Sequence, residues 1–162
     1  MSRLAELTAK IDGFFARVEA RYGDDMQCQT GCSDCCHVRL SITNVEADSI
    51  RADVATWPIG QRRALADDRG DRCAALDDRG RCRIYAARPV VCRSHGVPIR
   101  LREGSLPVIR SCHRNFTHTE AQADCVLDQE TLSTLVFAVD RAAGNDGSRL
   151  DLAMLLSNLA RE

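Results

Sequence analysis

Cysteine is the residue type of this chain with the clearest capacity for chemistry, because nine cysteines occur among 162 residues. Four of them stand close together, between positions 28 and 36, in the pattern Cys-x3-Cys-x2-Cys-Cys. A short loop can wrap several thiolates around one centre, and both structural zinc sites and iron–sulfur clusters use this arrangement. Four more cysteines follow at wider intervals. The predicted metal ligands are Cys28, Cys32, Cys35, Cys36, Cys73, Cys82, Cys92 and Cys112.

The expected compartment bears on whether these thiols bind metal or form disulfides. Residues 1–10 carry scattered charges and lack the apolar segment of a signal peptide, and no apolar run is long enough for a membrane span. We therefore expect a cytoplasmic protein without a membrane partner, in a compartment where thiols stay reduced. An odd number of cysteines also fits poorly with a closed set of disulfides. Metal binding is the favoured interpretation.

The adjacent pair Cys35-Cys36 constrains the kind of metal centre. Neighbouring side chains in an extended or turning backbone point in different directions, so we do not expect both to bind one mononuclear ion without strain. Two separate centres sharing this loop, or one polynuclear cluster, are the simplest solutions. Mixed Cys/His sites stay open, because His37, His95 and His113 lie beside or near cysteines, although each alone is more often a surface or supporting residue.

Two further residues, Cys125 and His118, are excluded from the predicted site. Cys125 stands in Ala-Asp-Cys-Val-Leu, where a buried helix cysteine acting as a small hydrophobe is the expected role. His118 lies away from the cysteines and receives no functional role.

Charge is distributed unevenly along the chain. The net charge of −1 argues against nucleic acid as a partner. Between residues 79 and 114, however, nine arginines face a single acid, Glu103. Such a belt would favour thiolates and offset an anionic metal centre, or form an arginine-rich face for an unknown protein partner. A simple solvated surface is the alternative. The arginines are 79, 81, 83, 88, 93, 100, 102, 110 and 114.

Hydrophobic spacing and capping patterns predict the elements that must position the cysteines. Apolar residues recur at three- and four-residue steps from Leu4 to Tyr22, and Thr43-Asn-Val-Glu46 is a capping-box pattern. Prolines near the Glu103-Gly-Ser105 turn indicate short or edge strands. The predicted elements are a helix over 3–22, a strand over 38–42, a helix from 43 to about 54, a short helix and loop before 71, a hairpin over 97–109, and helices over 128–144 and 148–159.

The predicted fold class is α+β and mainly helical, with a metal-stapled, irregular, cysteine-rich middle and a small hairpin packed on N- and C-terminal helices. We expect one domain over 1–162, with a metal-binding core at 28–112 and helical flanks at 1–23 and 128–162. Structural zinc binds small peptides with roughly 10–16 kcal/mol, comparable with the net stability of a domain. Metal removal is therefore predicted to unfold at least residues 28–112.

The compound cysteine pattern resembles the YkgJ-type CxxxCxxCC cysteine-cluster family over roughly residues 28–112. Besides the first cluster, the resemblance rests on Cys73-x8-Cys82-Arg-Ile-Tyr-Ala-Ala-Arg-Pro-Val-Val-Cys92-Arg93. It implies a zinc- or iron-chelating domain in which seven of the eight cysteines fall on the family's positions, with Cys112 a looser match. Tyr85, Arg88 and Pro89 fall on its Ile-Tyr-x-x-Arg-Pro element, whereas the Ala74-Ala75 that follows Cys73 departs from the family's Pro–Cys–Pro–Phe-like stretch.

A similar cysteine-rich domain occurs in flagellin lysine methylases, where it is associated with an iron–sulfur centre, and this resemblance favours an iron–sulfur cluster of the [4Fe–4S] type. The leading hypothesis is a cytosolic protein that holds such a cluster, with or without a second metal site, in a redox or accessory role to a partner enzyme. A zinc-stabilised structural or binding module is the alternative. A methyltransferase ranks lower because no cofactor motif outside the cysteine region supports it, and metal trafficking because it needs exchangeable, exposed ligands. Radical S-adenosylmethionine chemistry ranks lower because the chain is short for that barrel and Asp34 stands where those enzymes usually carry an aromatic residue.

Overall fold

The computed structural model describes residues 2–66 and 71–162, and the chain divides into two compact units. Unit 1 comprises Met1–Gln29 and Val90–Val139, and unit 2 comprises Thr30–Pro89 and Asp140–Glu162. About 50% of the chain is helical and 13% is strand, which confirms the predicted α+β, mainly helical class. One domain over 1–162 stays a prediction, and each unit is described by itself below.

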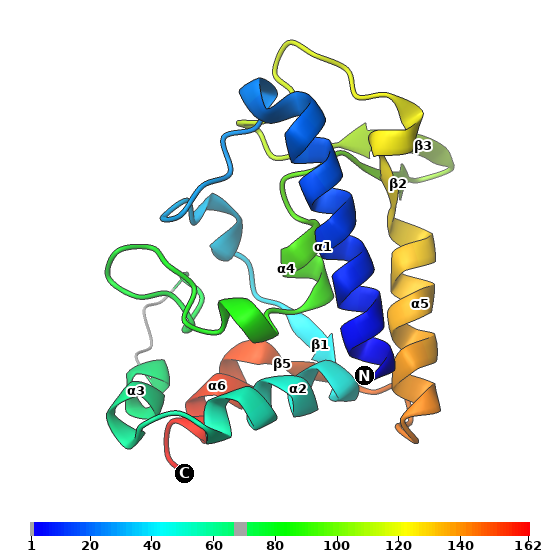
Figure 1. The fold of residues 1–162 in the computed structure, drawn as a ribbon. Coiled ribbons are helices and arrows are strands. Elements are labelled where there is room, and N and C mark those ends of the chain that lie inside the picture. The colour runs from blue at the N-terminus through cyan, green and yellow to red at the C-terminus, as the bar shows by residue number, and fades with distance from the viewer. Residues whose placement is uncertain (1, 67–70) are drawn as a thin grey trace. The chain divides into compact units, whose positions relative to one another are not determined.

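Unit 1 is built around the long helix α1 (Arg3–Tyr22), as the hydrophobic spacing predicts. Ser2 caps its N-terminus by accepting the Ala5 N–H, and its buried residues come from one side of the helix. The short helix α4 (Val90–Ser94) lies beside α1 (Figure 1). A nearly buried Arg93 guanidinium on α4 pairs with Asp12 of α1 at 2.6 Å and ties the two helices together.

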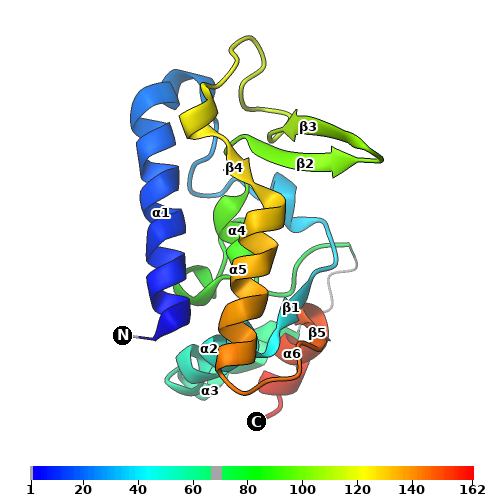
Figure 2. The same ribbon diagram turned by 90° about the vertical axis from the view of Figure 1, so that its right-hand side faces the viewer.

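A small sheet completes unit 1 and confirms the predicted hairpin. Strands β2 (Ile99–Glu103) and β3 (Leu106–Arg110) are antiparallel, joined by a turn at which Gly104 has a φ of 64°. Strand β4 (Leu127–Asp128) pairs in parallel with β2 and runs directly into helix α5 (Gln129–Ala142) (Figure 2). The buried core of unit 1 combines one residue of α1 with residues that follow α1, precede β2 and precede β4: Val18, Met26, Val97 and Cys125.

Unit 2 is organised by strand β1 (Ser41–Thr43), which pairs antiparallel with β5 (Arg149–Asp151). Each strand leads at once into a helix, α2 (Asn44–Ala55) after β1 and α6 (Leu152–Leu159) after β5. The predicted capping box of Thr43 and Glu46 is present at α2. These helices cover a core that includes Ile42, Ile50, Val54, Leu65, Leu152, Leu155 and Leu156.

Two predicted boundaries in unit 2 are wrong. The strand expected over 38–42 is limited to Ser41–Thr43, and the last helix begins at Leu152 instead of 148. Both errors have one cause. Residues 149–151 pair with β1 in a register that places Leu150 opposite Ile42, so they extend before the helix starts. Asp151 then caps α6 by accepting the Met154 N–H.

The polar stretch before Asp71 begins as predicted with helix α3 (Ile59–Arg63) and a 3-10 turn, η3 (Ala64–Ala66). The remainder of that predicted loop, 67–70, lies outside the described residues. Among the helices of the described chain, none combines the length and the apolar character that crossing a bilayer requires.

Candidate metal centre

The two units divide the predicted ligands between them. Cys28, Cys92 and Cys112 belong to unit 1. The other five belong to unit 2: Cys32, Cys35, Cys36, Cys73 and Cys82. The first cysteine of the Cys-x3-Cys-x2-Cys-Cys pattern is therefore grouped with residues far from it in sequence. Sequence spacing gave no sign of this division.

In unit 2 the cysteine doublet sits on a 3-10 turn, η2 (Asp34–Cys36), closed by the Cys36 N–H donating to the Ser33 carbonyl at 2.8 Å. The sulfurs of Cys35 and Cys36 lie 4.0 Å apart. Two thiolates bound at 2.3 Å to one tetrahedral ion would lie about 3.8 Å apart. The expectation that the doublet points its sulfurs in different directions is therefore wrong, because the tight turn brings them together.

Backbone hydrogen bonds bring two more cysteines to this turn. The Cys73 N–H donates to the Cys36 carbonyl at 2.9 Å, which fixes the two residues side by side. Cys82 forms a bridge with Leu76, and the Arg83 N–H donates to the Ala75 carbonyl at 2.7 Å. The chain between Cys73 and Cys82 thus forms a closed turn that returns to its starting point. Cys35, Cys36, Cys73 and Cys82 are called the unit 2 thiols below.

Asp77 stabilises that turn with its carboxylate. Its Oδ1 accepts the N–H groups of Arg79 and Arg81, and its Oδ2 pairs with the Arg81 guanidinium at 2.8 Å. The backbone hydrogen bond from Arg81, followed by the other donors and the charge of Arg81, lowers the pKa of Asp77 to about 2. The carboxylate is therefore ionised throughout the pH range in which thiolates bind metal.

The loop that carries Cys32 packs against the same turn through two glycines. Gly31 has a φ of 92° and Gly80 a φ of 72°, both in the left-handed region that favours glycine. A Cβ on Gly80 would lie 2.9 Å from the Gly31 carbonyl oxygen and 3.3 Å from the Ser33 Oγ. This close approach requires glycine at 80 and brings the Cys32 segment to the Cys73–Cys82 turn.

The unit 2 thiols influence one another electrostatically. The contact with Cys35, together with burial, raises the pKa of Cys36, and the charges of Cys73 and Cys82 add to this. Burial raises the pKa of Cys73, to which the charge of Cys35 contributes. Burial raises the pKa of Cys82 to about 11, with a contribution from Cys73 and an opposing one from Arg88. Thiolates gathered in this way repel one another, and a bound cation would relieve that repulsion.

The unit 2 thiols lie near one another but are not yet in the geometry of a metal site. Within residues 2–66 and 71–162, no three or more His, Cys, Asp or Glu side chains are placed so that they could hold an ion. Four soft sulfur donors in a partly buried setting nevertheless fit the chemistry of zinc or iron. Binding would require Cys73 and Cys82 to close on the Cys35–Cys36 pair. The eight predicted ligands stay predictions.

In unit 1 the Cys28 sulfur is held between Asn115 and Gly96. Asn115 donates a hydrogen bond from Nδ2 to Cys28 Sγ at 3.2 Å, and Gly96 leaves room for the sulfur. The Asn115 N–H donates to the Cys112 carbonyl at 2.9 Å, and Cys92 lies on α4 shortly before Gly96. Sequence reasoning missed Asn115 and Gly96, because neither residue type signals metal chemistry.

The predicted histidine substitutes differ in their surroundings. His95 Nδ1 lies 2.9 Å from the Val91 carbonyl oxygen, which can only accept, so Nδ1 donates and Nε2 is the ring nitrogen left to bind a metal ion. This arrangement is the one expected of a metal-binding histidine. His37 Nδ1 lies 3.6 Å from Asp71, on the exposed surface of unit 2. The sequence alone could not show that the surroundings of His95 and His37 differ.

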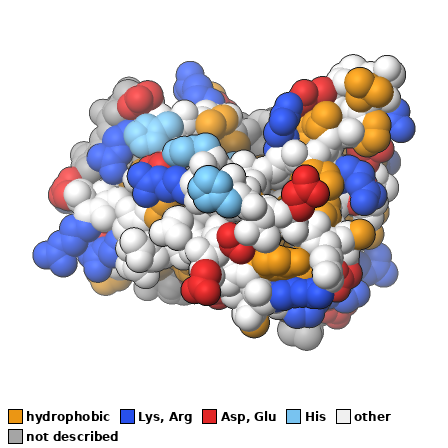
Figure 3. Space-filling view, turned by 90° about the horizontal axis from the view of Figure 1, so that it is seen from above, with side chains coloured by type: hydrophobic (Ala, Val, Ile, Leu, Met, Phe, Trp, Pro, Cys, Tyr) orange, Lys and Arg blue, Asp and Glu red, His pale blue; other side chains and the backbone are white. Residues whose placement is uncertain are grey.

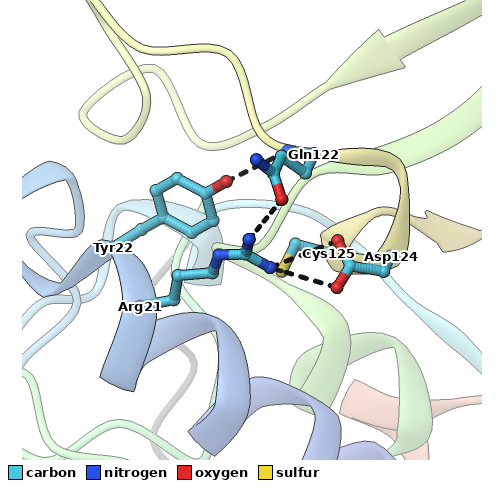
Figure 4. A network of polar contacts seen from close by, with 5 residues as sticks. All are labelled: Arg21, Tyr22, Gln122, Asp124 and Cys125. Carbon is cyan, nitrogen blue, oxygen red and sulfur yellow. Dashed lines mark hydrogen bonds and ion pairs between the residues drawn. The ribbon is translucent and has the colours of Figure 1, made fainter.

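Cys125 is buried, as predicted, and packs in the core of unit 1 on the 3-10 helix η5 (Ala123–Cys125) instead of an α-helix. Figure 4 shows Arg21 of α1 directed at Gln122, Asp124 and the Cys125 sulfur. Tyr22 adds a hydrogen bond from the Gln122 N–H to its hydroxyl at 3.1 Å. This network fastens η5 to α1 and gives Cys125 a structural role.

The arginine belt is largely neutralised by acids. The ion pairs of its members include Arg81–Asp77, Arg93–Asp12, Arg100–Asp128, Arg102–Glu130 and Arg110–Glu103. Four of the five acids lie outside the 79–114 segment, so the sequence window overstated the local charge. On the right-hand side of the face shown in Figure 3, basic and acidic side chains are interspersed with apolar ones. Arg88 stacks on Tyr85, 3.7 Å from the ring centroid.

Comparison with known proteins adds one finding. A family model described as "CxxCxxCC: Putative zinc- or iron-chelating domain" matches residues 27–126, which is more than half of the chain. The comparisons with curated proteins and with solved structures gave no match. The match confirms the resemblance drawn from the cysteine pattern, while the relation to flagellin lysine methylases stays a hypothesis. The chain belongs to this family of zinc- or iron-chelating domains.

Proposed function

We propose that the unit 2 thiols hold one metal ion on four thiolates, and that zinc is the ion. The observation that carries this proposal is the 4.0 Å separation of the Cys35 and Cys36 sulfurs. In a [4Fe–4S] cluster, the type that the resemblance implied, each thiolate binds a different iron, so two ligand sulfurs lie farther apart than two thiolates on one ion. The geometry therefore reverses the order of preference that the sequence suggested.

A four-thiolate zinc site has no open coordination position and no redox chemistry, so its role is structural. It would tie the η2 turn to the Cys73–Cys82 turn, both of which lack a long helix or strand to hold them. The thiols Cys73 and Cys82 pack at the edge of the unit 2 core, so the ion would connect these turns with that core. The proposed function is a zinc-stabilised binding module without catalysis of its own.

An iron–sulfur cluster is the second candidate, and the number of thiols favours it. Unit 2 holds a fifth cysteine, Cys32, on the loop packed against Gly80, and one mononuclear ion does not need it. A [4Fe–4S] cluster with Cys32 among its ligands would give the protein a redox or accessory role to a partner enzyme. For either candidate the expected setting is a reducing compartment such as the cytoplasm, because thiols stay available for metal binding there.

The deciding experiment is anaerobic purification of the full chain without added metal, followed by analysis for zinc, iron and acid-labile sulfide and by a visible spectrum. We expect a colourless protein with zinc and without iron or acid-labile sulfide. Cys36→Ser should lose one zinc ion per chain, the ion of the unit 2 thiols, whereas Cys125→Ala, which removes a buried sulfur outside the site, should lose none. Iron and sulfide in equal amounts, together with a broad visible band, would show that the protein holds an iron–sulfur cluster and would overturn the zinc proposal. Full metal retention in both Cys36→Ser and Cys82→Ser would show that the ligand assignment is wrong.

A further inference from the structure

Asn115 is a buried polar residue of unit 1, 2% exposed, whose side chain uses every hydrogen-bonding group it has for short contacts. Its Oδ1 accepts the Gln27 N–H at 2.8 Å. Its Nδ2 donates to the Gly96 carbonyl at 2.8 Å and to Cys28 Sγ at 3.2 Å. Because the backbone N–H can only donate and the carbonyl can only accept, the amide can take only this orientation. One Nδ2 proton is thereby directed at the sulfur.

Gly96 forms the other side of the pocket around this sulfur. Its φ of 103° lies in the region that favours glycine. A Cβ on residue 96 would lie 2.6 Å from Cys28 Sγ, 3.4 Å from Asn115 Nδ2 and 3.5 Å from a ring carbon of Phe15. The sulfur therefore occupies the space that a side chain at position 96 would fill. Gly96 and Asn115 are called the Cys28 cradle below.

The cradle is part of the segments that carry other predicted ligands of unit 1. Asn115 closes a turn on Cys112, and the Ser111 hydroxyl donates to the Asn115 carbonyl at 3.2 Å. Gly96 follows α4, which carries Cys92, and its neighbour His95 presents Nε2 as described above. A sulfur held between these segments is oriented by neutral groups of the protein before any ion binds.

We propose that Asn115 is a positioning residue that holds Cys28 as a metal ligand within unit 1. The inference rests on the proposed function only in that the cysteines of this chain bind metal. A hydrogen bond from an amide to a thiolate is charge-assisted, so it strengthens when Cys28 binds an ion as thiolate. Groups that orient a ligand in this way typically contribute 10–100-fold to metal affinity. The expected ligand is a thiophilic divalent ion such as Zn²⁺ or Cd²⁺.

The test is NMR spectroscopy of the full chain loaded with ¹¹³Cd²⁺. Scalar coupling from ¹¹³Cd to cysteine Hβ protons identifies each bound thiolate, and coupling to a side-chain amide proton requires an N–H···S bond to a bound sulfur. We expect Cys28 Hβ and one Asn115 Nδ2 proton to couple to the same ¹¹³Cd. Cadmium bound to Cys28 with no coupling or shift at the Asn115 amide would overturn the inference, as would absence of cadmium from Cys28.

The same spectra separate this inference from the proposed function. Coupling at the unit 2 thiols without coupling at Cys28 would support the four-thiolate site and overturn the role of Asn115. Coupling at Cys28 and Asn115 without coupling at the unit 2 thiols would do the opposite. A chain that binds no cadmium through any cysteine would overturn both.

Two variants measure the size of the effect by chelator competition, with the Cys28–¹¹³Cd coupling as the readout. Asn115→Asp keeps the acceptor for the Gln27 N–H and removes both Nδ2 donors, and Gly96→Ala pushes directly on the sulfur. Each should lower metal affinity at Cys28 about 10–100-fold. The matched control is Gly104→Ala, whose φ is also positive but whose Cβ would meet nothing within 4 Å. Equal affinity in Gly96→Ala and Gly104→Ala, both folded, would contradict the cradle.

Discussion

The sulfur of Cys28 in unit 1 and the unit 2 thiols are held in opposite ways. Cys28 accepts a hydrogen bond from a fully satisfied Asn115 and fits the space left by Gly96. The unit 2 thiols are gathered by backbone hydrogen bonds, and burial and mutual charge raise the pKa values of Cys36, Cys73 and Cys82. The protein itself stabilises the Cys28 sulfur, whereas the thiolate forms of the unit 2 thiols need a bound cation for stabilisation. The structure of unit 2 should therefore depend on metal more than that of unit 1.

The largest effect that would test this comparison is metal removal. Because structural zinc contributes roughly 10–16 kcal/mol in small peptides, a chelator should abolish amide-exchange protection in the η2 and Cys73–Cys82 turns of unit 2. Protection in α1 and the Cys28 cradle should fall less. Hydrogen exchange with residue-level readout measures both. Equal loss in the two units, or no loss in either, would show that the units do not differ in metal dependence.

A smaller loss is expected from the unit 2 core. Leu156 on α6 is fully buried in the cluster against which Cys73 and Cys82 pack. Leu156→Ala should lower the free energy of unfolding of the metal-loaded protein by about 2–5 kcal/mol, because it leaves a cavity. It should also make zinc easier to remove, since folding and binding are linked.

Met154→Ala on the same helix is the control, because its side chain is exposed and its loss should cost less than about 0.5 kcal/mol. Denaturant unfolding at fixed zinc concentration measures both variants. A Leu156→Ala protein that unfolds at a lower denaturant concentration yet holds zinc as tightly as the natural chain would show that the core and the thiols are not coupled.

How much the sequence could predict depends on how local each feature is. The helix over 3–22 and the Thr43–Glu46 capping box rest on neighbours in the chain, and both were found. Strand β5 was missed, because its extended shape comes from pairing with β1 more than a hundred residues earlier. The resemblance to a family of metal-chelating domains followed from the cysteine spacing. The division of the predicted ligands between the two units and the roles of Asn115 and Gly96 could not be predicted, because they depend on contacts between distant segments.

The Cys35–Cys36 doublet and the arginine belt show the same limit. Adjacent side chains diverge in an extended chain, but the η2 turn bends the backbone enough to bring the sulfurs within 4.0 Å. Counting charge in a sequence window also misleads, because Asp12, Asp128 and Glu130 reach the arginines from outside it. A sequence window shows which groups are available and not which of them meet.

A smaller effect would sharpen the account of unit 2. Gly80→Ala places a methyl group 2.9 Å from the Gly31 carbonyl oxygen, whereas Gly144→Ala in the same unit meets nothing within 4 Å. Both variants pay about 1–2 kcal/mol for a left-handed residue with a side chain. Only Gly80→Ala should also weaken zinc binding, because it separates the Cys32 loop from the Cys73–Cys82 turn. Equal zinc affinity in the two variants would mean that this contact does not support the site.

The smallest effect concerns pH and unit 1. The Asp128 carboxylate caps α5 by accepting the Thr131 N–H at 2.8 Å, and this bond, with the nearby Arg100, lowers the pKa of Asp128. A lowered pKa means that the charged form is favoured in the folded state, so its stabilisation is present above the ordinary aspartate pKa of about 3.9 and is lost as pH falls through the folded value. Asp128→Asn should therefore reduce α5 protection at pH 7 and approach the natural chain in acid.

Amide exchange followed at α5 alone separates this titration from acid release of metal by the thiols of unit 2. The matched control is Glu130→Gln, which breaks the exposed pair with Arg102 two residues along but leaves the Asp128 cap intact. Its effect should be close to zero, since exposed ion pairs contribute little. If Glu130→Gln changed α5 protection as much as Asp128→Asn and with the same pH dependence, the general charge of the sheet edge would be responsible. The Asp128 cap would then have no separate part in stabilising α5, and unit 1 would not be held by local hydrogen bonds in the way that the comparison with unit 2 requires.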